Sequence, residues 1–499
     1  MKTALLLSVL LALEAFSLEG DVRTRLWRRF PSCRGTIEGA YAGDEMSFFH
    51  RIRFDAGKWD FTLMLDKSRG EEWVDIVAGG VTFIPDSAWA GPLSLGWLEA
   101  DLGSGLVFSH PGSWSAPSEL SAYKPPMIRE IVRTASSPGD CRGDPLTGAG
   151  FSMTAAGLNF CMLAGVSWKD ASGDGHHRTQ SEIEARGAIR ETLGAIRVSN
   201  GWWGATAAAG AESEPEGQAS WGRGGFDWDL GFPAFRLTGE AAAGADTSGV
   251  SAAWWAAASL ASDGYRQTLT AMGNPDEFPS ERSSAPMERE GNGLTYGFRW
   301  TVVPRLTLTG GAGAWLREGD ELFRASAETA FRFPFSMESA FGFRFSREQD
   351  SSDWRGWLSC SWQPLEEAGL GMRVQLTGSD PGEQEAAASG EGLGLTVKWE
   401  PAAWLSARLM CSGFDTEGYS TRIYYAEPTF PGEFGSTALW GRGFLMGVSL
   451  SAELREGAFL RARISRLSVE NMESLGSGWE ETEGGSRTEF GLQLDWAFP

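Results

Sequence analysis

The four histidines of this chain are the main candidates for catalytic residues: His50, His110, His176 and His177. Ser109 precedes His110, but adjacency in the chain does not place an imidazole on the neighbouring hydroxyl. The sequence contains neither G-x-S-x-G nor H-E-x-x-H, and the five cysteines show no metal-ligand spacing. We therefore expect no enzyme activity, no cofactor and no metal site. A catalytic site at a barrel rim that uses His110 or His176 is the alternative.

Charged residues that alternate with apolar ones are a more informative set. In residues 322–333, Arg324 and Glu328 lie on one face of an extended chain, and Phe323 and Phe331 lie on the other. This period of two predicts strands with one apolar and one charged face, and a charged face enclosed by a barrel would line its lumen. The predicted lumen residues are Arg51, Arg53, Arg299, Arg324, Glu328, Arg332, Glu338, Arg344, Arg373, Lys398, Arg408, Glu453, Arg461 and Arg463. Such charges either stiffen the wall as ladders or set ion selectivity.

The elements that carry these charges recur as runs of roughly 9 to 12 residues, the length that a tilted strand needs to cross a membrane. Short turns join the runs at 55–57, 199–201, 262–264, 333–334, 400–402 and 455–457. They alternate with longer polar loops at 169–189, 211–224, 273–292, 379–389, 415–439 and 469–487. This alternation predicts an all-β fold: a large closed antiparallel transmembrane β-barrel of about 24 strands (roughly 22–26), with short periplasmic turns and long external loops.

The last strand shows the pattern most clearly. Its apolar face alternates with polar or small residues up to the end of the chain. The pattern resembles the C-terminal assembly signal of bacterial outer-membrane barrels at Glu489, Gly491, Leu494, Trp496 and Phe498, with Pro499 after the expected final aromatic residue. The resemblance implies outer-membrane lipid and the barrel assembly machinery as partners.

The N-terminus predicts export. Lys2, an apolar core at 4–13 and a small-x-small site at 15–17 form the pattern of a signal peptide, so we expect 1–17 to be cleaved and 18–499 to form the barrel. The expected location is the outer membrane of a Gram-negative-type bacterium. The net charge of −22 argues against nucleic acid as a partner.

Three local features stay open at this level. The first strand is either 21–30 or 36–42, and 421–426 is expected to form a hairpin standing above the membrane. Cys33 and Cys141 lie in predicted loops and are candidates for a disulfide after export, although sequence does not show whether they are close.

The interior of so large a barrel needs something to fill it, because 16 to 18 strands already leave an aqueous channel. The candidate is the long insertion 110–146, whose basic residues include Lys124, Arg129 and Arg133; an ordinary external loop is the alternative. We predict a channel or transporter for an unidentified solute or polymer. The competing hypothesis is a non-conducting scaffold with a filled lumen that binds a periplasmic or surface protein.

A further resemblance rests on residues 177–184, residues 191–194, the glycine-rich stretch 102–106 and the pair Tyr265-Arg266. These segments resemble predicted outer-membrane barrels that carry a helix-hairpin-helix domain before the barrel. The helix-hairpin-helix portion implies contact with DNA in that family, but the present sequence contains no such portion, so DNA binding is not expected here. Within 177–184, Ser181 and Glu184 match a capping box for a short helix in an external loop.

Overall fold

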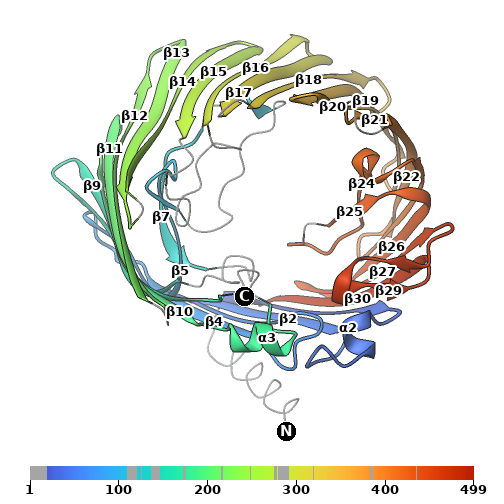
Figure 1. Cartoon of the computed structure of the whole chain (residues 1–499), viewed down its shortest axis with the longest axis horizontal. Helices are drawn as coiled ribbons and strands as arrows, with labels where there is room; N and C mark the ends of the chain where they lie inside the picture. The colour runs from blue at the N-terminus through green and yellow to red at the C-terminus, as the bar shows by residue number, and fades with distance from the viewer. Residues whose placement is uncertain are drawn as a thin grey trace.

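A computed structural model describes residues 19–109, 121–124, 126–135, 146–171, 176–214, 217–247, 249–274, 278, 291–317, 320–382, 386–433 and 435–498. Twenty-four antiparallel strands form a closed barrel, as the sequence predicts (Figure 1). The wall strands are β1(Glu19–Phe30), β2(Met46–Ala56), β3(Trp59–Lys67), β4(Ile76–Phe83), β5(Ala90–Gly103), β8(Leu146–Ala155), β9(Leu158–Lys169), β10(Ile189–Ser199), β11(Trp203–Glu214), β12(Gly217–Gly231), β13(Phe235–Ala245), β14(Val250–Ser262), β15(Tyr265–Asn274), β16(Gly291–Val303), β17(Leu306–Arg317), β18(Asp320–Phe333), β19(Met337–Glu348), β20(Ser351–Leu365), β21(Ala368–Asp380), β22(Ala388–Ala402), β23(Leu405–Thr416), β26(Gly441–Arg455), β27(Ala458–Val469) and β30(Ser486–Phe498).

The barrel closes where the first strand meets the last. β1 pairs with β30 along almost its whole length, from Gly20 opposite Phe498 to Phe30 opposite Thr488. The choice between two first strands is thereby decided in favour of 21–30. The alternative segment 36–42 forms no strand, because Arg34–Ile37 turns into the short helix α2.

The outer face carries the predicted apolar residues. Phe341 is 59% exposed and Leu395 is 48% exposed, whereas their sequence neighbours on the opposite face point inward. The tryptophans Trp59, Trp168, Trp300, Trp354, Trp362, Trp399 and Trp404 are also exposed. An apolar belt on the outside of a closed sheet, with indoles towards strand ends, is the surface that a bilayer covers. Among the described residues, no helix is both long and apolar enough to cross a membrane.

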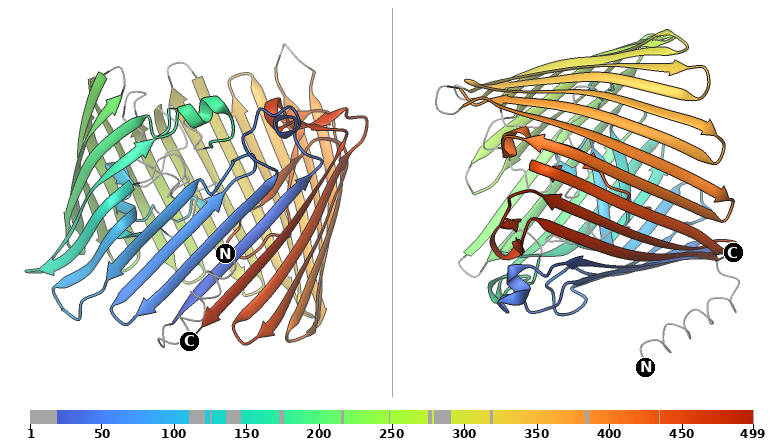
Figure 2. Two further views of the ribbon diagram at one scale, coloured as in Figure 1. Left: turned by 90° about the horizontal axis from the view of Figure 1, so that it is seen from below. Right: turned by 90° about the vertical axis from the view of Figure 1, so that its right-hand side faces the viewer.

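The two ends of the barrel differ. The predicted short turns all join wall strands at the end where β30 finishes, while α2 and the helix α3(Gln180–Glu184) lie at the opposite end (Figure 2). One predicted long loop is wrong: 211–224 belongs to the hairpin of β11 and β12, with Gly210 opposite Trp221. Its small residues lack the apolar alternation of the other strands, which hid them from the sequence pattern.

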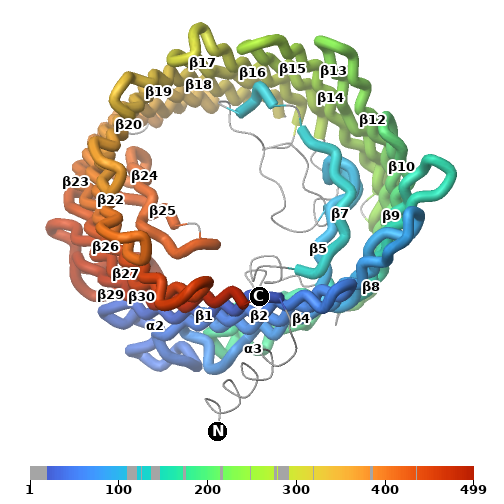
Figure 3. The backbone as a smooth tube through the Cα atoms, turned by 180° about the vertical axis from the view of Figure 1, so that it is seen from behind, coloured from blue at the N-terminus to red at the C-terminus, as the bar shows by residue number. Residues whose placement is uncertain are grey.

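One wall strand turns inward midway. The first part of β5 pairs with β8, from Leu93 to Trp97, and the second part pairs with the inner strand β7(Arg129–Thr134), from Leu98 to Gly103. β5 ends at Gly103, whose φ is 79°, and β6(Phe108–Ser109) folds back beside it. β7 and the second part of β5 lie inside the ring in Figures 1 and 3.

A second segment enters the ring after β23. The hairpin predicted at 421–426 is longer than expected: residues 423–426 form the single strand β24(Ile423–Ala426), which pairs with β25(Ser436–Leu439). The 3-10 turn Tyr419–Thr421 precedes the hairpin, whose predicted place above the membrane is wrong. It lies inside the barrel (Figure 1), where the Tyr425 hydroxyl donates to the carbonyl of Arg373 over 2.9 Å. Gly394 makes this possible, because a Cβ there would come within 2.3 Å of the Tyr425 ring.

Charged side chains inside the lumen fasten the closing seam. Arg23 Nε lies 2.6 Å from Asp495 Oδ1, and Arg461 pairs with the other oxygen of the same carboxylate. Six residues further along β1, Arg29 meets Glu489 over 2.6 Å. Because these groups are largely shielded from water, the loss of one partner should lower the stability of the barrel more than the loss of an exposed charge would.

We predict that Asp495→Ala destabilises the barrel by about 2 kcal/mol, because two partly buried guanidinium groups lose a shared carboxylate. Urea unfolding of the refolded protein, followed by tryptophan fluorescence, measures this change. Asp229→Ala is the matched control: Asp229 pairs with the more exposed Arg236, so its loss should cost less than about 1 kcal/mol. Equal losses in the two variants would contradict the proposed role of the seam.

Candidate functional site: the barrel lumen

The side of the lumen from β8 to β15 is packed with apolar residues. Leu102, Leu106 and Phe108 of the inward segment are buried against wall residues that include Leu193 and Trp255. Many other wall residues in this cluster are alanines, at positions 195, 208, 242, 253 and 257. Small inward side chains leave room for the segment, so this side of the lumen is filled with a dry core.

Polar contacts hold the same segment to the wall. The buried Arg197 guanidinium donates to Asp227 over 3.0 Å and to Glu130 of β7 over 3.0 Å. Buried Glu240 accepts the backbone N–H of Ser104 over 2.8 Å, and Trp255 Nε1 donates to the Ser104 hydroxyl over 2.6 Å. Sequence reasoning selected none of these wall residues. Because buried charges are costly without partners, the contacts specify where the segment docks.

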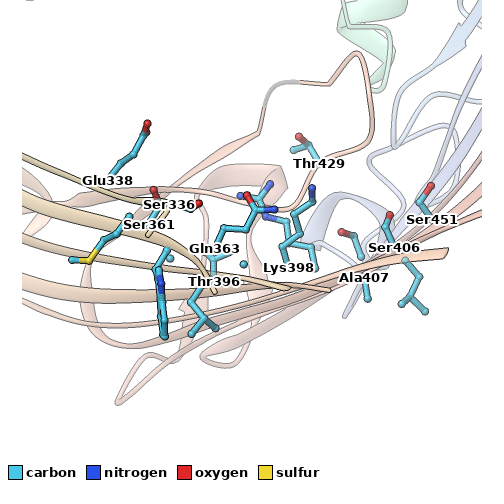
Figure 4. Close-up of a pocket in the computed structure, with 18 of the residues that line it drawn as sticks. Ser336, Glu338, Ser361, Gln363, Thr396, Lys398, Ser406, Ala407, Thr429 and Ser451 are labelled. Carbon is cyan, nitrogen blue, oxygen red and sulfur yellow. The ribbon is translucent and has the colours of Figure 1, made fainter. Parts of the chain in front are cut away.

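The side from β16 to β27 holds open space. A cavity of about 1000 Å³ lies between the wall and the inward loop, with Glu338, Lys398 and Ser451 around it (Figure 4). A second cavity of about 630 Å³ includes Arg373 and Tyr424 in its lining. The two cavities share several lining residues and are therefore neighbours.

Seven of the predicted lumen residues form ion pairs among the described residues, in six pairs. The pairs are Arg51–Asp21, Arg53–Asp60, Arg332–Glu338, Lys398–Glu400, Arg461–Asp495 and Arg463–Glu433. Glu433 belongs to the loop between β24 and β25, and it also meets Arg25 over 3.1 Å. These contacts fit wall ladders of alternating charge, with one rung supplied by the inward loop.

The other predicted lumen residues lie among aromatic rings or beside like charges. Arg299 donates to the Tyr123 hydroxyl, Arg324 lies over Trp315, Glu328 accepts from Trp357 and Arg373 lies over Trp357. In the strand register, Arg344 is directly opposite Arg355, Arg408 is opposite Lys398 and Glu453 is opposite Phe459. Sequence reasoning missed Arg355 and omitted Arg23 and Arg25 from the lumen set, although the period of two in β1 places both on one face.

The predicted assembly signal occupies the closing strand. Glu489 pairs with Arg29, Leu494 is exposed on the outer face, and Phe498 is buried against Gly20. Gly491 faces the Phe430 ring of the inward loop, which a Cβ would approach within 2.8 Å. Trp496 packs at 5.5 Å from Phe498. Recognition of this strand by an assembly machinery stays a prediction.

At the rim opposite the short turns, a carboxylate ties loops together. Glu480 accepts hydrogen bonds from Tyr41 over 2.9 Å and from Arg178 over 3.0 Å, and it also pairs with Arg69. These residues come from separate loops on both sides of the seam. The contact gives the loops one shared anchor.

The histidines and cysteines are placed as follows. His177 lies between Asp75, at 2.6 Å, and Asp170, at 3.1 Å, while His50 contacts Thr24 over 2.8 Å. His176 is 3.7 Å from Glu71, and His110 lies outside the described residues. Within the described part of the chain, no group of three or more His, Cys, Asp or Glu is placed to hold a metal. Cys33 is a buried free thiol, and its suggested partner Cys141 lies outside the described residues.

The capping box of α3 is shifted from its predicted register. Thr179, rather than Ser181, caps the helix: its hydroxyl accepts the Glu182 N–H, and the Glu182 carboxylate accepts the Thr179 N–H over 2.9 Å. Both Thr179–Glu182 and Ser181–Glu184 fit the spacing, but Glu182 also accepts the Arg178 N–H over 2.8 Å. These added contacts favour the observed register.

This cap predicts an acid-sensitive loop. Partial burial acts to raise the pKa of Glu182, but hydrogen bonds from the Thr179 amide and from Arg178 lower it more, so its pKa lies below the usual 4.5. The stabilisation is therefore complete above about pH 4.5 and is lost as the pH falls through the folded-state pKa.

We expect hydrogen-exchange protection of α3, corrected for the intrinsic exchange rate, to fall in that acidic window. Glu182→Gln should weaken protection at neutral pH and remove its acid dependence, whereas Glu184→Gln should leave the dependence in place. An acid response that survives in Glu182→Gln would contradict this assignment.

Comparison with known proteins gives structural neighbours only. No family model matches the chain, and no curated protein matches it. The siderophore receptor PirA of Acinetobacter baumannii aligns over 96% of this chain and 80% of its own, with 8% identity and a TM-score of 0.47. The FrpB iron transporter of Neisseria meningitidis covers 97% and 83%, with 8% identity and a TM-score of 0.43. The copper transporter OprC covers 97% and 80%, with 10% identity and a TM-score of 0.45. The resemblance to helix-hairpin-helix barrels stays a prediction.

Proposed function

We propose that this protein is an integral outer-membrane barrel that passes or transports a solute through its lumen. The observation that carries the proposal is the uneven filling of the ring. The inward strands occupy the side from β8 to β15, whereas cavities of about 1000 and 630 Å³ remain beside β16 to β27. If the inward strands served only to fill and stiffen the lumen, these two cavities would not be expected along the other half of the wall.

The surface supports the membrane setting of this proposal. The exposed apolar residues follow the outer face of the strands, and charged side chains follow the inner face. Lipid is the environment that favours this inversion of the usual pattern for a soluble protein. Outer-membrane lipid and the barrel assembly machinery are thus the proposed partners, with cleavage of residues 1–17 before insertion.

The filled side sets the alternative. The segment β5–β7 buries apolar residues as a domain core does, and Glu130 of β7 pairs with the buried Arg197 of the wall. A barrel with this construction could also serve as a scaffold whose lumen does not conduct. Conductance separates the two functions, because only the channel or transporter provides a continuous aqueous path.

We predict stepwise currents when the refolded protein is inserted in planar bilayers. Deletion of 109–142 removes β7 together with its contacts to Arg197, so the conductance step should increase severalfold. Deletion of 383–387, from the connection between β21 and β22, is the control, because it shortens a loop without removing an inward strand and should leave the step height near its original value. Silence from both the intact protein and the 109–142 deletion would favour the scaffold.

A further inference from the structure

The open half of the lumen has the opposite charge to the molecule as a whole. The chain carries a net charge of −22, yet the basic side chains around the two cavities outnumber the acidic ones. The principal basic residues are Arg299, Arg332, Arg373, Lys398, Arg408 and Arg461, against Glu328 and Glu338. This region is therefore a positively charged surface enclosed by an acidic protein.

The two acidic side chains already have partners. Glu338 lies 2.8 Å from Arg332, and Glu328 accepts a hydrogen bond from Trp357 over 3.3 Å. In contrast, no acidic side chain among the described residues lies within salt-bridge distance of Arg373 or Arg408. Lys398 and Arg461 pair with Glu400 and Asp495 of the wall, so the positive charge that no described carboxylate balances lies at residues such as Arg373 and Arg408.

The strand register adds to this imbalance. Arg408 on β23 is directly opposite Lys398 on β22, and Arg355 on β20 is directly opposite Arg344 on β19. Like charges directly across a sheet destabilise the pairing. A bound anion would offset the repulsion between these like charges. A structural ladder of opposite charges would need no such anion.

Aromatic contacts orient the arginines. The Arg373 guanidinium lies 5.9 Å from the centre of the Trp357 ring, and Arg355 lies 5.4 Å from that of Tyr424. Tyr424 belongs to the inward hairpin, whose hydrogen bond from Tyr425 to the Arg373 carbonyl fixes it to β21. Guanidinium groups held in this way keep N–H donors for a ligand, because ring faces do not use them.

We propose that the wall from β20 to β23 binds a small multivalent oxyanion, a solute with phosphate or carboxylate groups, on its path through the lumen. The inference rests on the proposed function and names its solute class. Planar guanidinium groups accept both kinds of oxyanion in paired hydrogen bonds. The cavity of about 630 Å³ that Arg373 and Arg408 line has the size of a small-molecule site.

Isothermal titration of the purified barrel at low ionic strength tests the site with two probes, inorganic pyrophosphate and citrate. We expect the intact protein to bind at least one of them. The double variant Arg373→Gln/Arg408→Gln should bind that probe about tenfold more weakly, because two charge-assisted contacts are lost. Arg34→Gln, a change on the exposed rim, should retain the original affinity.

A second variant covers a folding failure of the double variant. Ser449 is directly opposite Arg408 on β26, so Ser449→Glu supplies an internal carboxylate that competes with the ligand and should weaken binding too. Binding by neither probe, or the same affinity in both lumen variants as in the intact protein, would overturn the anion site.

Bilayer currents report separately on the proposed function. Binding without current would support the anion site and defeat passage. Current without binding of either probe would support passage and overturn the anion site.

Discussion

Pairing of the first strand with the last is the constraint on which the rest of this molecule depends. Without it the sheet has two unpaired edges in a solvent that offers the backbone no hydrogen bonds. The seam joins parts of the chain more than 450 residues apart, and charges on its inner side reinforce the backbone pairing. Arg25 shows how the seam extends into the lumen: it donates to Gln493 over 2.7 Å and also meets Glu433 of the inward loop. The same side chain, Arg25, therefore contacts both the closing strand and the loop that enters the lumen.

Two kinds of inner wall follow from the choice of residues. Alanine and glycine on β10 to β14 leave depth for β5–β7, which packs against them as in a protein core. Larger basic residues on β18 to β23 instead line the two cavities. The inward hairpin packs against this second wall, where glycines also make room for it, as Gly394 does for Tyr425. The size of inward side chains thus decides where the lumen is filled.

The fold was predictable because its signal is local and repeated. Alternation of period two and the asymmetry between turns and loops gave the barrel, its strand number and the facing of residues such as Phe341 and Leu395. The inward hairpin was misplaced, since its position depends on Gly394 and Tyr425, which are 31 residues apart and meet only in the closed barrel. Arg197 and Glu240 were missed for the same reason. Their partners come from distant strands, and a single buried charge carries no periodic signature.

The change of partner within β5 has a mechanical consequence. The first half of β5 pairs with the wall strand β8 and the second half pairs with the inner strand β7, so no flexible hinge separates the inward segment from the wall. Residues 76–79 of β4 pair with β3 but not with β5. Where β5 turns inward, this part of β4 therefore has a pairing strand on one side and not on the side of β5. Movement of the inward segment out of the lumen would thus deform the barrel wall itself. Any regulated widening of the passage is expected to involve a shift of the wall at this breach.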